Sequence, residues 1–230
     1  MLEHGIGNGR VAIPLAKAGI EVTGIDHSQA MLDDLHARLA KEAPEVRKRV
    51  RTHCADLRTK KLGKRFPLIF CPFNAALHFY TRPDIEQWLA RSAEHLEPGG
   101  ELVFDISVPI AKDLARDPAR AYRIPPFAHP NAGRVAYREH FDYDPIRQVL
   151  FVSMFFEPAP RKGAKPNPKQ ITETFMTPLA QRQIYPQEME ALLHYNGWDV
   201  KELYGDYERG PLEPKSDVMV WHVQPRKKKR

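Results

Sequence analysis

The stretch "LEHGIGNGRVAIPLAKAGIEVTGID", residues 2–26, decides the fold of this chain. Gly5, Gly7 and Gly9 stand at alternate positions, and a helical pattern of apolar residues follows them as far as Gly19. Residues 21–26 are rich in β-branched side chains and end on Asp26, which predicts a strand. A glycine-rich turn, a helix and a strand with a terminal acid are typical of a cradle for a nucleotide-like ligand, because glycine lets the backbone approach the ligand and the acid can accept ribose hydroxyls.

Two alternatives remain open on these residues alone. Gly7, Gly9 and Ala12 also satisfy the G-x-G-x-x-A pattern of dinucleotide sites, and Asp26 suits the ribose acid of that pattern. The glycines could also form an ordinary tight turn with no ligand.

The first 108 residues alternate helical and strand patterns, which predicts a parallel sheet covered on both faces. A helix is expected over 28–43, with Ser28 as its N-cap and Met31, Leu32, Leu35 and Leu39 on one face. Strands are expected at 50–57, 67–73 and 101–108, and a helix at 82–100 that ends at Pro98-Gly99-Gly100.

The alternation breaks after residue 108. Segments 134–143 and 148–157 predict a β-hairpin around the turn "DPIR", and 170–184 predicts a third strand. A helix over 186–197 and two final strands then resume the first pattern. We therefore divide the chain into an α/β core at 1–108, an antiparallel β insertion at 109–185, the end of the core at 186–224 and a basic tail at 225–230.

Composition excludes several classes of protein. The 230 residues are 42% hydrophobic, as in globular chains, and no apolar run is long enough for a membrane helix. The net charge of +6 is concentrated in the last five residues and in the loop 160–169, so the rest of the chain is near −3 and does not indicate a nucleic-acid partner. Cys54 and Cys71 form no disulfide framework and no metal-binding pattern. We expect a cytoplasmic protein without a metal site.

The segment "LEHGIGNGRVAIPLAKAGIEVTGIDHSQAML" resembles motif I and the acidic loop of class I S-adenosylmethionine-dependent methyltransferases. The family pattern of an acid followed by G-x-G-x-G is matched by Glu3, Gly5, Gly7 and Gly9. The resemblance continues through "ADL" at 55–57, "FPLIFCPFNAALHFYT" at 66–81 and "HLEPGGELVFDI" at 95–106, and covers 186–224 more loosely. It implies a doubly wound, Rossmann-like seven-stranded sheet with a truncated first strand and an inserted antiparallel β subdomain.

The resemblance also implies S-adenosylmethionine as the cofactor and a role for each matching residue. Glu3 and the glycine loop would hold the methionine part, Asp26 the ribose, and Asp56 with Leu57 the adenine. The full set of expected cofactor residues is Glu3, Gly5, Gly7, Gly9, Asp26, His27, Ser28, Asp56, Leu57, Cys71 and Phe73.

The acceptor side is less defined. The stretch "PFNAALHFYTRPD" resembles methyltransferases that act on small molecules, and the 109–185 insertion would then be a flap beside the acceptor. His78 could face the reacting centre or pack on the next helix; with His140 and Arg182 it completes the catalytic candidates. Because side chains alternate along a strand, we expect Arg138 and His140 to share the face that looks toward a small polar or anionic acceptor. The acceptor itself, the atom methylated and a homodimer are left open.

The two residues before Glu3 are fewer than the helix and complete first strand that family members carry there. We expect either an upstream start or a weakened, repurposed protein. Two other functions therefore stay open beside methyl transfer: a nicotinamide-dependent oxidoreductase, and a non-catalytic cofactor-binding protein.

Overall fold

The computed structural model describes residues 1–159, 163 and 167–227. Within it the chain divides into two compact units, one formed by residues 1–108 with the segment from Ile184 onward, the other by Pro109–Gln183. Most of the basic loop expected at 160–169, and the last three residues of the basic tail, lie outside the described residues.

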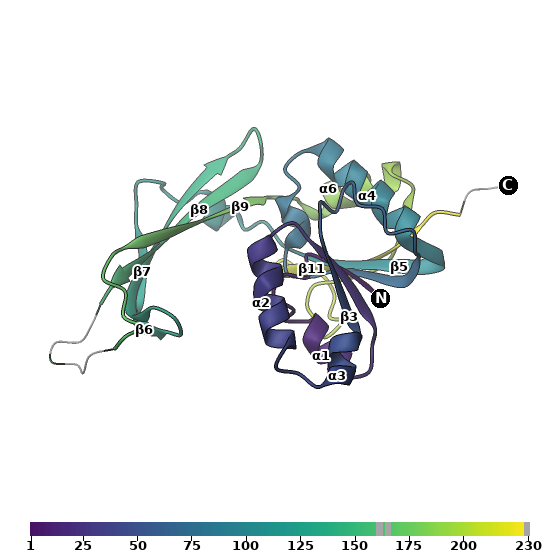
Figure 1. Ribbon diagram of the computed structural model, residues 1–230. Coiled ribbons are helices and arrows are strands. Elements are labelled where there is room, and N and C mark those ends of the chain that lie inside the picture. The colour runs from purple at the N-terminus through teal and green to yellow at the C-terminus, as the bar shows by residue number, and fades with distance from the viewer. Residues whose placement is uncertain (160–162, 164–166, 228–230) are drawn as a thin grey trace. The chain divides into compact units, whose positions relative to one another are not determined.

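The first unit is built on a seven-stranded sheet with the order β10-β11-β5-β4-β1-β2-β3 (Figure 1). β1 pairs in parallel with β2 and β4, β2 with β3, and β4 with β5, whereas β11 runs antiparallel to both β5 and β10. The strands are β1 Leu2–His4, β2 Val22–Asp26, β3 Val50–Cys54, β4 Phe66–Cys71, β5 Leu96–Ser107, β10 Trp198–Tyr204 and β11 Val218–Pro225.

Two separate apolar clusters pack in this unit, as a sheet covered on both faces requires. The larger cluster joins the sheet to α4 (Arg82–His95) and α6 (Pro186–Tyr195), and contains the rings of Trp88, Phe104 and Trp221. The smaller one joins the sheet to α1 (Ala12–Lys17) and α2 (Gln29–Leu39). The doubly wound sheet predicted from the sequence is thus confirmed.

Helix starts follow local sequence signals. The Ser28 hydroxyl accepts the Met31 N–H at 3.4 Å at the start of α2, as expected for an N-cap. Thr81 opens α4 with a reciprocal capping box to Asp84, and Pro186 stands in the first turn of α6.

Two helices are shorter in the structure than the sequence predicts. The helix expected at 28–43 ends at Leu39, and a separate short helix, α3 (Pro44–Lys48), begins at the proline. The helix expected at 82–100 ends at His95, because Leu96 is already extended and begins β5. Gly100 lies inside that strand, where an added Cβ would come within 2.9 Å of the Pro67 carbonyl oxygen. Met31, expected on the buried face of its helix, is 42% exposed.

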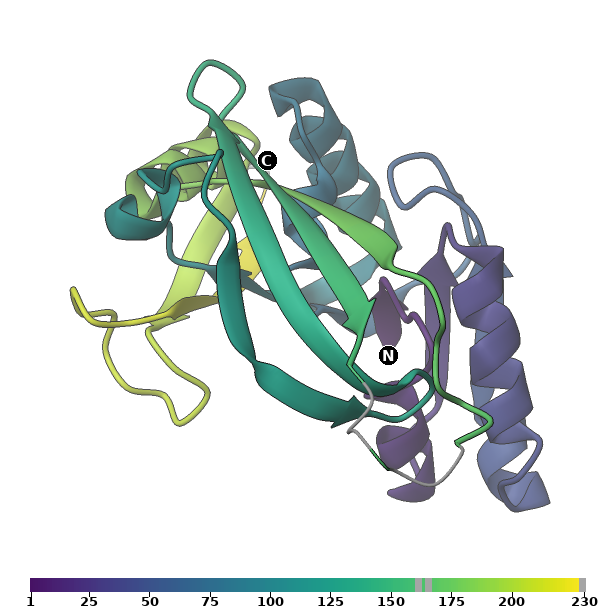
Figure 2. The same cartoon turned by 90° about the vertical axis from the view of Figure 1, so that its left-hand side faces the viewer.

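The second unit is a four-stranded antiparallel sheet with the order β6-β7-β8-β9 (Figure 2), preceded by the short helix α5 (Ala111–Leu114). Its strands are β6 Tyr122–His129, β7 Gly133–Asp144, β8 Val149–Pro158 and β9 Phe175–Arg182. The hairpin β7–β8 and the strand β9 match the sequence prediction, but β6 was missed. Pro125 and Pro126 argue against a strand in the sequence, because proline cannot donate a backbone hydrogen bond. The pairing of β6 with β7 shifts register at these residues, and an edge strand tolerates proline at such an irregularity.

Candidate active site

The glycine loop follows β1 directly and needs glycine for its backbone shape. Gly5, Gly7 and Gly9 have φ values of 71°, 51° and 75°, a region that L side chains rarely adopt. The Gly5 N–H donates to the Ile25 carbonyl at 2.8 Å, which fastens the loop to the end of β2. A Cβ on Gly7 would lie 3.2 Å from the Met31 Cε atom, so the loop is also closely packed against α2.

Asp26 connects this loop to the start of α2. Its Oδ2 accepts the Gly7 N–H at 2.8 Å, and its Oδ1 accepts the Ser28 N–H at 2.9 Å. The carboxylate is only 9% exposed, whereas the neighbouring His27 is exposed, with Nδ1 3.8 Å from Asp26 Oδ1. Each carboxylate oxygen retains a further lone pair, so Asp26 can anchor the loop and still accept hydroxyl donors.

Glu3 is a buried acid with an unused acceptor. Its side chain lies in β1, is 2% exposed, and its Oε2 has no hydrogen-bond partner among the described residues. Burial raises the pKa of Glu3 to about 8, against the opposing effect of the nearby Arg10 charge. An unpartnered buried carboxyl oxygen is destabilising unless a donor, best a cation, is brought to it. This is the feature that fits the ammonium group of S-adenosylmethionine.

The loop after β4 is held in an unusual backbone conformation. Phe73 and Asn74 have φ values of 61° and 62°, although neither is glycine. The Asn74 N–H donates to Asp105 Oδ1 at 3.0 Å, and Asn74 Oδ1 accepts the Ser107 N–H at 2.6 Å. These bonds fix the loop against β5 and leave Phe73 72% exposed. Backbone outliers held this firmly are common at functional sites.

Cys71 and Asp105 lie beneath this loop. Cys71 is fully buried, and burial together with the charges of Asp105 and Glu3 raises the pKa of its thiol. Asp105, which is 4% exposed, lies close to Tyr207 from the β10–β11 loop. The pKa of Tyr207 is raised by partial burial and then by that carboxylate. Glu3, Cys71 and Asp105 therefore come together from β1, β4 and β5, which are neighbours in the sheet.

Asp56, expected at the adenine, is already engaged by a residue that sequence reasoning missed. Arg58 Nε and Nη2 donate to its two oxygens at 3.0 and 2.6 Å, and Arg58 also pairs with Asp84. The hydrogen bond from Arg58 lowers the pKa of Asp56. Leu57 is half-buried against the larger apolar cluster. An arginine two residues after the acid was the available signal for this pair.

The three catalytic candidates do not come together in one unit. His78 ends a short 3₁₀ helix, Ala75–His78, in the first unit; it is exposed, with Nδ1 3.4 Å from the Tyr80 hydroxyl. His140 and Arg182 belong to the second unit. Arg182 Nη2 donates to Gln148 Oε1 at 2.6 Å.

Within the second unit, Arg138 and His140 are in direct contact. Arg138 Nη1 lies 2.8 Å from His140 Nε2, and Arg138 Nε donates to Glu157 Oε1 at 2.7 Å. The Tyr137 hydroxyl bonds Glu139 instead. Arg138 and His140 therefore share one face of β7, as expected, and Tyr137 pairs with Glu139.

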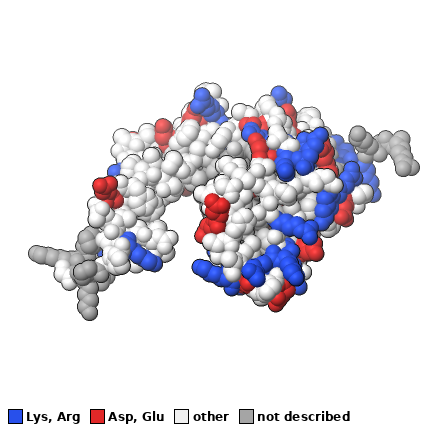
Figure 3. Space-filling view, in the orientation of Figure 1, with Lys and Arg blue, Asp and Glu red and all other residues white. Residues whose placement is uncertain are grey.

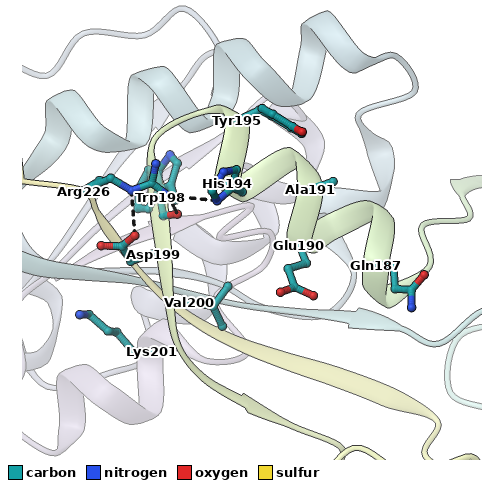
Figure 4. A pocket seen from close by; sticks show the side chains of 10 residues that line it. All are labelled: Gln187, Glu190, Ala191, His194, Tyr195, Trp198, Asp199, Val200, Lys201 and Arg226. Atoms are coloured by element: carbon teal, nitrogen blue, oxygen red, sulfur yellow. Dashed lines mark hydrogen bonds and ion pairs between the residues drawn. The ribbon is translucent and has the colours of Figure 1, made fainter.

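A surface cavity of about 620 Å³ lies elsewhere, between α6 and β10 (Figure 4). Arg226 lines this cavity and contacts two other lining residues. Its Nε lies 2.9 Å from Asp199 Oδ1, and its Nη2 lies 3.3 Å from His194 Nδ1. Because three strands separate β10 from β1, this cavity is not part of the glycine-loop site.

Clustered metal ligands and long apolar helices are absent from the described residues. These residues contain no group of three or more His, Cys, Asp and Glu side chains arranged to hold a metal ion. None of their helices is both long and apolar enough to cross a membrane. On the face shown in Figure 3, the basic and acidic side chains of the first unit are intermixed rather than segregated.

Residues 1–100 match the protein family described as a methyltransferase domain. The matched segment is less than half of the 230-residue chain. It contains the glycine loop, Glu3, Asp26, Asp56 and the loop after β4, so the resemblance found in the sequence is confirmed where the site is built.

A curated relative is dTDP-3-amino-3,4,6-trideoxy-alpha-D-glucopyranose N,N-dimethyltransferase from Streptomyces venezuelae, 30% identical over 105 residues. The match spans 46% of this chain and 41% of that relative, so the chain matches about two fifths of the relative's length.

Solved structures share the fold over nearly the whole chain. The CcbJ methyltransferase from Streptomyces caelestis has a TM-score of 0.81 at 24% identity, covering 98% of this chain and 83% of its own. CalS10, an amino pentose methyltransferase from Micromonospora echinaspora, has a TM-score of 0.68 at 20% identity, covering 96% and 81%. At these identities the likeness establishes the fold: a Rossmann-like α/β domain with an inserted antiparallel β subdomain.

Proposed function

We propose that this chain transfers a methyl group from S-adenosylmethionine to a small-molecule acceptor. The observation that carries the proposal is the unpartnered, buried Glu3 oxygen beside the glycine loop and Asp26, within a segment of the methyltransferase-domain family. When bound, the cofactor supplies a methyl group already activated on a sulfonium sulfur.

The residues of the chain bind and orient rather than perform covalent chemistry. Glu3 would accept the ammonium group, the glycine loop would admit the amino-acid end, and Asp26 would accept the ribose hydroxyls. Asp56 would accept the adenine amine while Arg58 holds its carboxylate in place. Such positioning supplies much of the rate enhancement of a transfer between two bound groups, so a dedicated base is needed only if the acceptor arrives protonated.

For the acceptor, we propose a small polar molecule that carries an amine. The names of two relatives, an N,N-dimethyltransferase of an amino sugar nucleotide and an amino pentose methyltransferase, support this class. His78, His140 and Arg182 remain our candidates for the acceptor side. The basic pair Arg138–His140 suits a polar or anionic group, although Arg138 is shared with Glu157.

Calorimetric titration with S-adenosylhomocysteine and, separately, with NAD tests the proposal. We expect saturable binding of the first and none of the second, and then methyl transfer from labelled S-adenosylmethionine to members of an amino-sugar panel. Binding of NAD alone would support the oxidoreductase alternative, which the methyltransferase relatives do not favour. Binding of S-adenosylhomocysteine without transfer to any acceptor would support the non-catalytic alternative.

The division of labour between segments is part of the proposal. Residues 1–108 and 186–224 would bind the cofactor, and 109–185 would supply the acceptor flap. A cytoplasmic location is supported by the two free cysteines, Cys54 and Cys71. We do not propose a nucleic-acid partner. Analytical ultracentrifugation would determine whether the chain forms a dimer.

A further inference from the structure

Arg10, which directly follows the glycine loop, has no role in the functional assignments above. Its guanidinium carbon lies 4.7 Å from the centroid of the Phe73 ring. Stacking of this kind holds a guanidinium in place while leaving its in-plane N–H donors available. Phe73 is in turn carried by the loop that Asn74 fastens to β5. Arg10 therefore connects the loops that follow β1 and β4.

The charge of Arg10 acts directly on the candidate site. Among the described residues, Arg10 forms no ion pair with a carboxylate. Burial raises the pKa of Glu3 and of Tyr207, and the nearby charge of Arg10 opposes both rises. The site thus presents one unpartnered acceptor oxygen, on Glu3, and one cationic fork beside it.

These two groups match the two charges of an α-amino acid. An ammonium group requires an acceptor such as Glu3 Oε2, and a carboxylate is bound best by the planar fork of an arginine. We propose that Arg10 binds the carboxylate of the cofactor's amino-acid end while Glu3 binds its ammonium group, so that the pair selects ligands with a zwitterionic end. This inference rests on the proposed function and names the binding residues of that same site.

The test compares two ligands that differ only at this end. S-adenosylhomocysteine carries the amino acid, whereas methylthioadenosine has the same nucleoside and sulfur without it. Both are titrated by calorimetry into the full chain and into Arg10→Ala, Arg10→Lys and Phe73→Leu. Arg47→Ala is the matched control, because Arg47 is an exposed arginine on α3 of the same unit.

We expect Arg10→Ala to weaken S-adenosylhomocysteine by about tenfold or more, since a charge-assisted pair is lost. Methylthioadenosine should change by less than about twofold, because it makes no contact with Arg10. Arg10→Lys should lie between the unchanged chain and the alanine variant, since lysine keeps the charge without the fork. Phe73→Leu should also weaken only S-adenosylhomocysteine, by releasing the guanidinium from its stacked position.

The other outcomes separate this inference from the proposed function. If the unchanged chain binds neither ligand, the proposed function itself fails. If it binds both and Arg10→Ala weakens both equally, Arg10 supports the loop instead of reading the carboxylate. If Arg10→Ala leaves S-adenosylhomocysteine unchanged, Arg10 has no part in binding. Circular dichroism of each variant confirms that it is folded.

Discussion

The raised pKa of Glu3 predicts that ligand binding is coupled to proton release. In the free protein burial raises the pKa of Glu3 to about 8, so near pH 7 the carboxyl group is mainly protonated. A bound ammonium favours the ionised form, and binding should therefore release close to one proton. We predict that S-adenosylhomocysteine affinity rises between about pH 6 and pH 8, and that calorimetry in buffers of different ionisation enthalpy detects the released proton. Glu3→Gln should bind more weakly and show neither effect; proton release that persists in this variant would have to come from another group.

Asp26 has a structural role in addition to the expected contact with the ribose. Its carboxylate accepts N–H groups from both Gly7 and Ser28, so Asp26→Ala leaves two backbone donors without their acceptor. We predict a loss of about 2–4 kcal/mol in S-adenosylhomocysteine binding and a loss of about 1–3 kcal/mol in the free energy of unfolding. Calorimetric titration and urea unfolding measure the two losses. Asp33→Ala, an exposed acid on α2, is the control for both. An unchanged affinity would place the ligand elsewhere.

At the scale of elements, the loop after β4 is fixed in place by hydrogen bonds to β5. Asn74 combines a φ of 62° with side-chain bonds to Ser107. Asn74→Ala would keep the strained backbone without those bonds. We predict that this variant loses about 1–3 kcal/mol of stability in urea unfolding and becomes more susceptible to proteolysis within residues 72–80. A loss of stability without local cleavage would show that the loop keeps its conformation through the Asp105 contact alone.

The acceptor flap gives a second prediction at this scale. Replacement of His140 or Arg182 by Ala should raise the acceptor KM or lower kcat while S-adenosylhomocysteine affinity stays within about twofold, because cofactor binding is untouched. Methyl-transfer kinetics and calorimetry provide the two readouts. Arg147→Ala, in the turn between β7 and β8, is the matched control. Equal losses of cofactor and acceptor binding would give the flap a structural role, and normal kinetics would remove both residues from the site.

Local sequence signals were sufficient to predict most helices and strands. They failed where packing between strands determines the secondary structure. Ser28 and Pro186 mark helix starts in the sequence, and the alternation of 134–157 marks the hairpin. The end of α4 was misplaced because Pro98-Gly99-Gly100 resembles a helix stop, whereas Gly100 is required by the close approach of β4 and β5. β6 was missed because its prolines are compatible with a strand only at an edge.

The same limit applies to the site. The acid and the glycines are recognisable in order along the chain, because they lie on one strand and its loop. Other contacts join segments that are far apart in the sequence, so no local pattern predicts them. They are Arg58 with Asp84, Arg10 with Phe73, and Tyr207 with Asp105. Prediction from the sequence therefore proposed the acids as ligand contacts and missed two arginines that lie beside them, Arg10 and Arg58.

At the scale of the whole molecule, buried titratable groups set the pH range of stability. His4 in β1 accepts the Trp88 indole N–H at 3.0 Å, and His95 Nε2 accepts the Leu62 N–H at 3.2 Å. The remaining nitrogen of each ring has no partner among the described residues, and both side chains are nearly inaccessible. Burial lowers the pKa of His4 from its ordinary value of 6.5 to about 3 and also lowers that of His95. Glu3 shifts in the opposite direction, to about 8.

The direction of each contribution follows from which state binds more protons. Below about pH 6.5 the unfolded chain protonates both histidines more readily than the folded chain does, so folding stability falls as the solution is acidified. Between its ordinary value of 4.5 and about 8, Glu3 is protonated in the folded chain and ionised in the unfolded one, so its contribution to stability rises as the pH falls. These effects oppose each other between pH 6.5 and 4.5, where two histidines act against one acid. We therefore expect maximal stability near pH 6.5.

Urea unfolding from pH 5 to pH 8 tests this expectation, and two variants separate the groups. Glu3 contributes a decline of at most about 1.4 kcal/mol per pH unit between pH 6.5 and 8, and this contribution should disappear in Glu3→Gln, since the titrating acid is gone. His95→Gln keeps an acceptor for the Leu62 N–H and removes one histidine, so its stability should fall less steeply below pH 6.5. Its stability at pH 8 measures the structural effect of the substitution, because neither histidine is charged there. The scheme is wrong if Glu3→Gln keeps the alkaline decline, or if His95→Gln differs from the unchanged chain by the same amount at pH 5 and at pH 8.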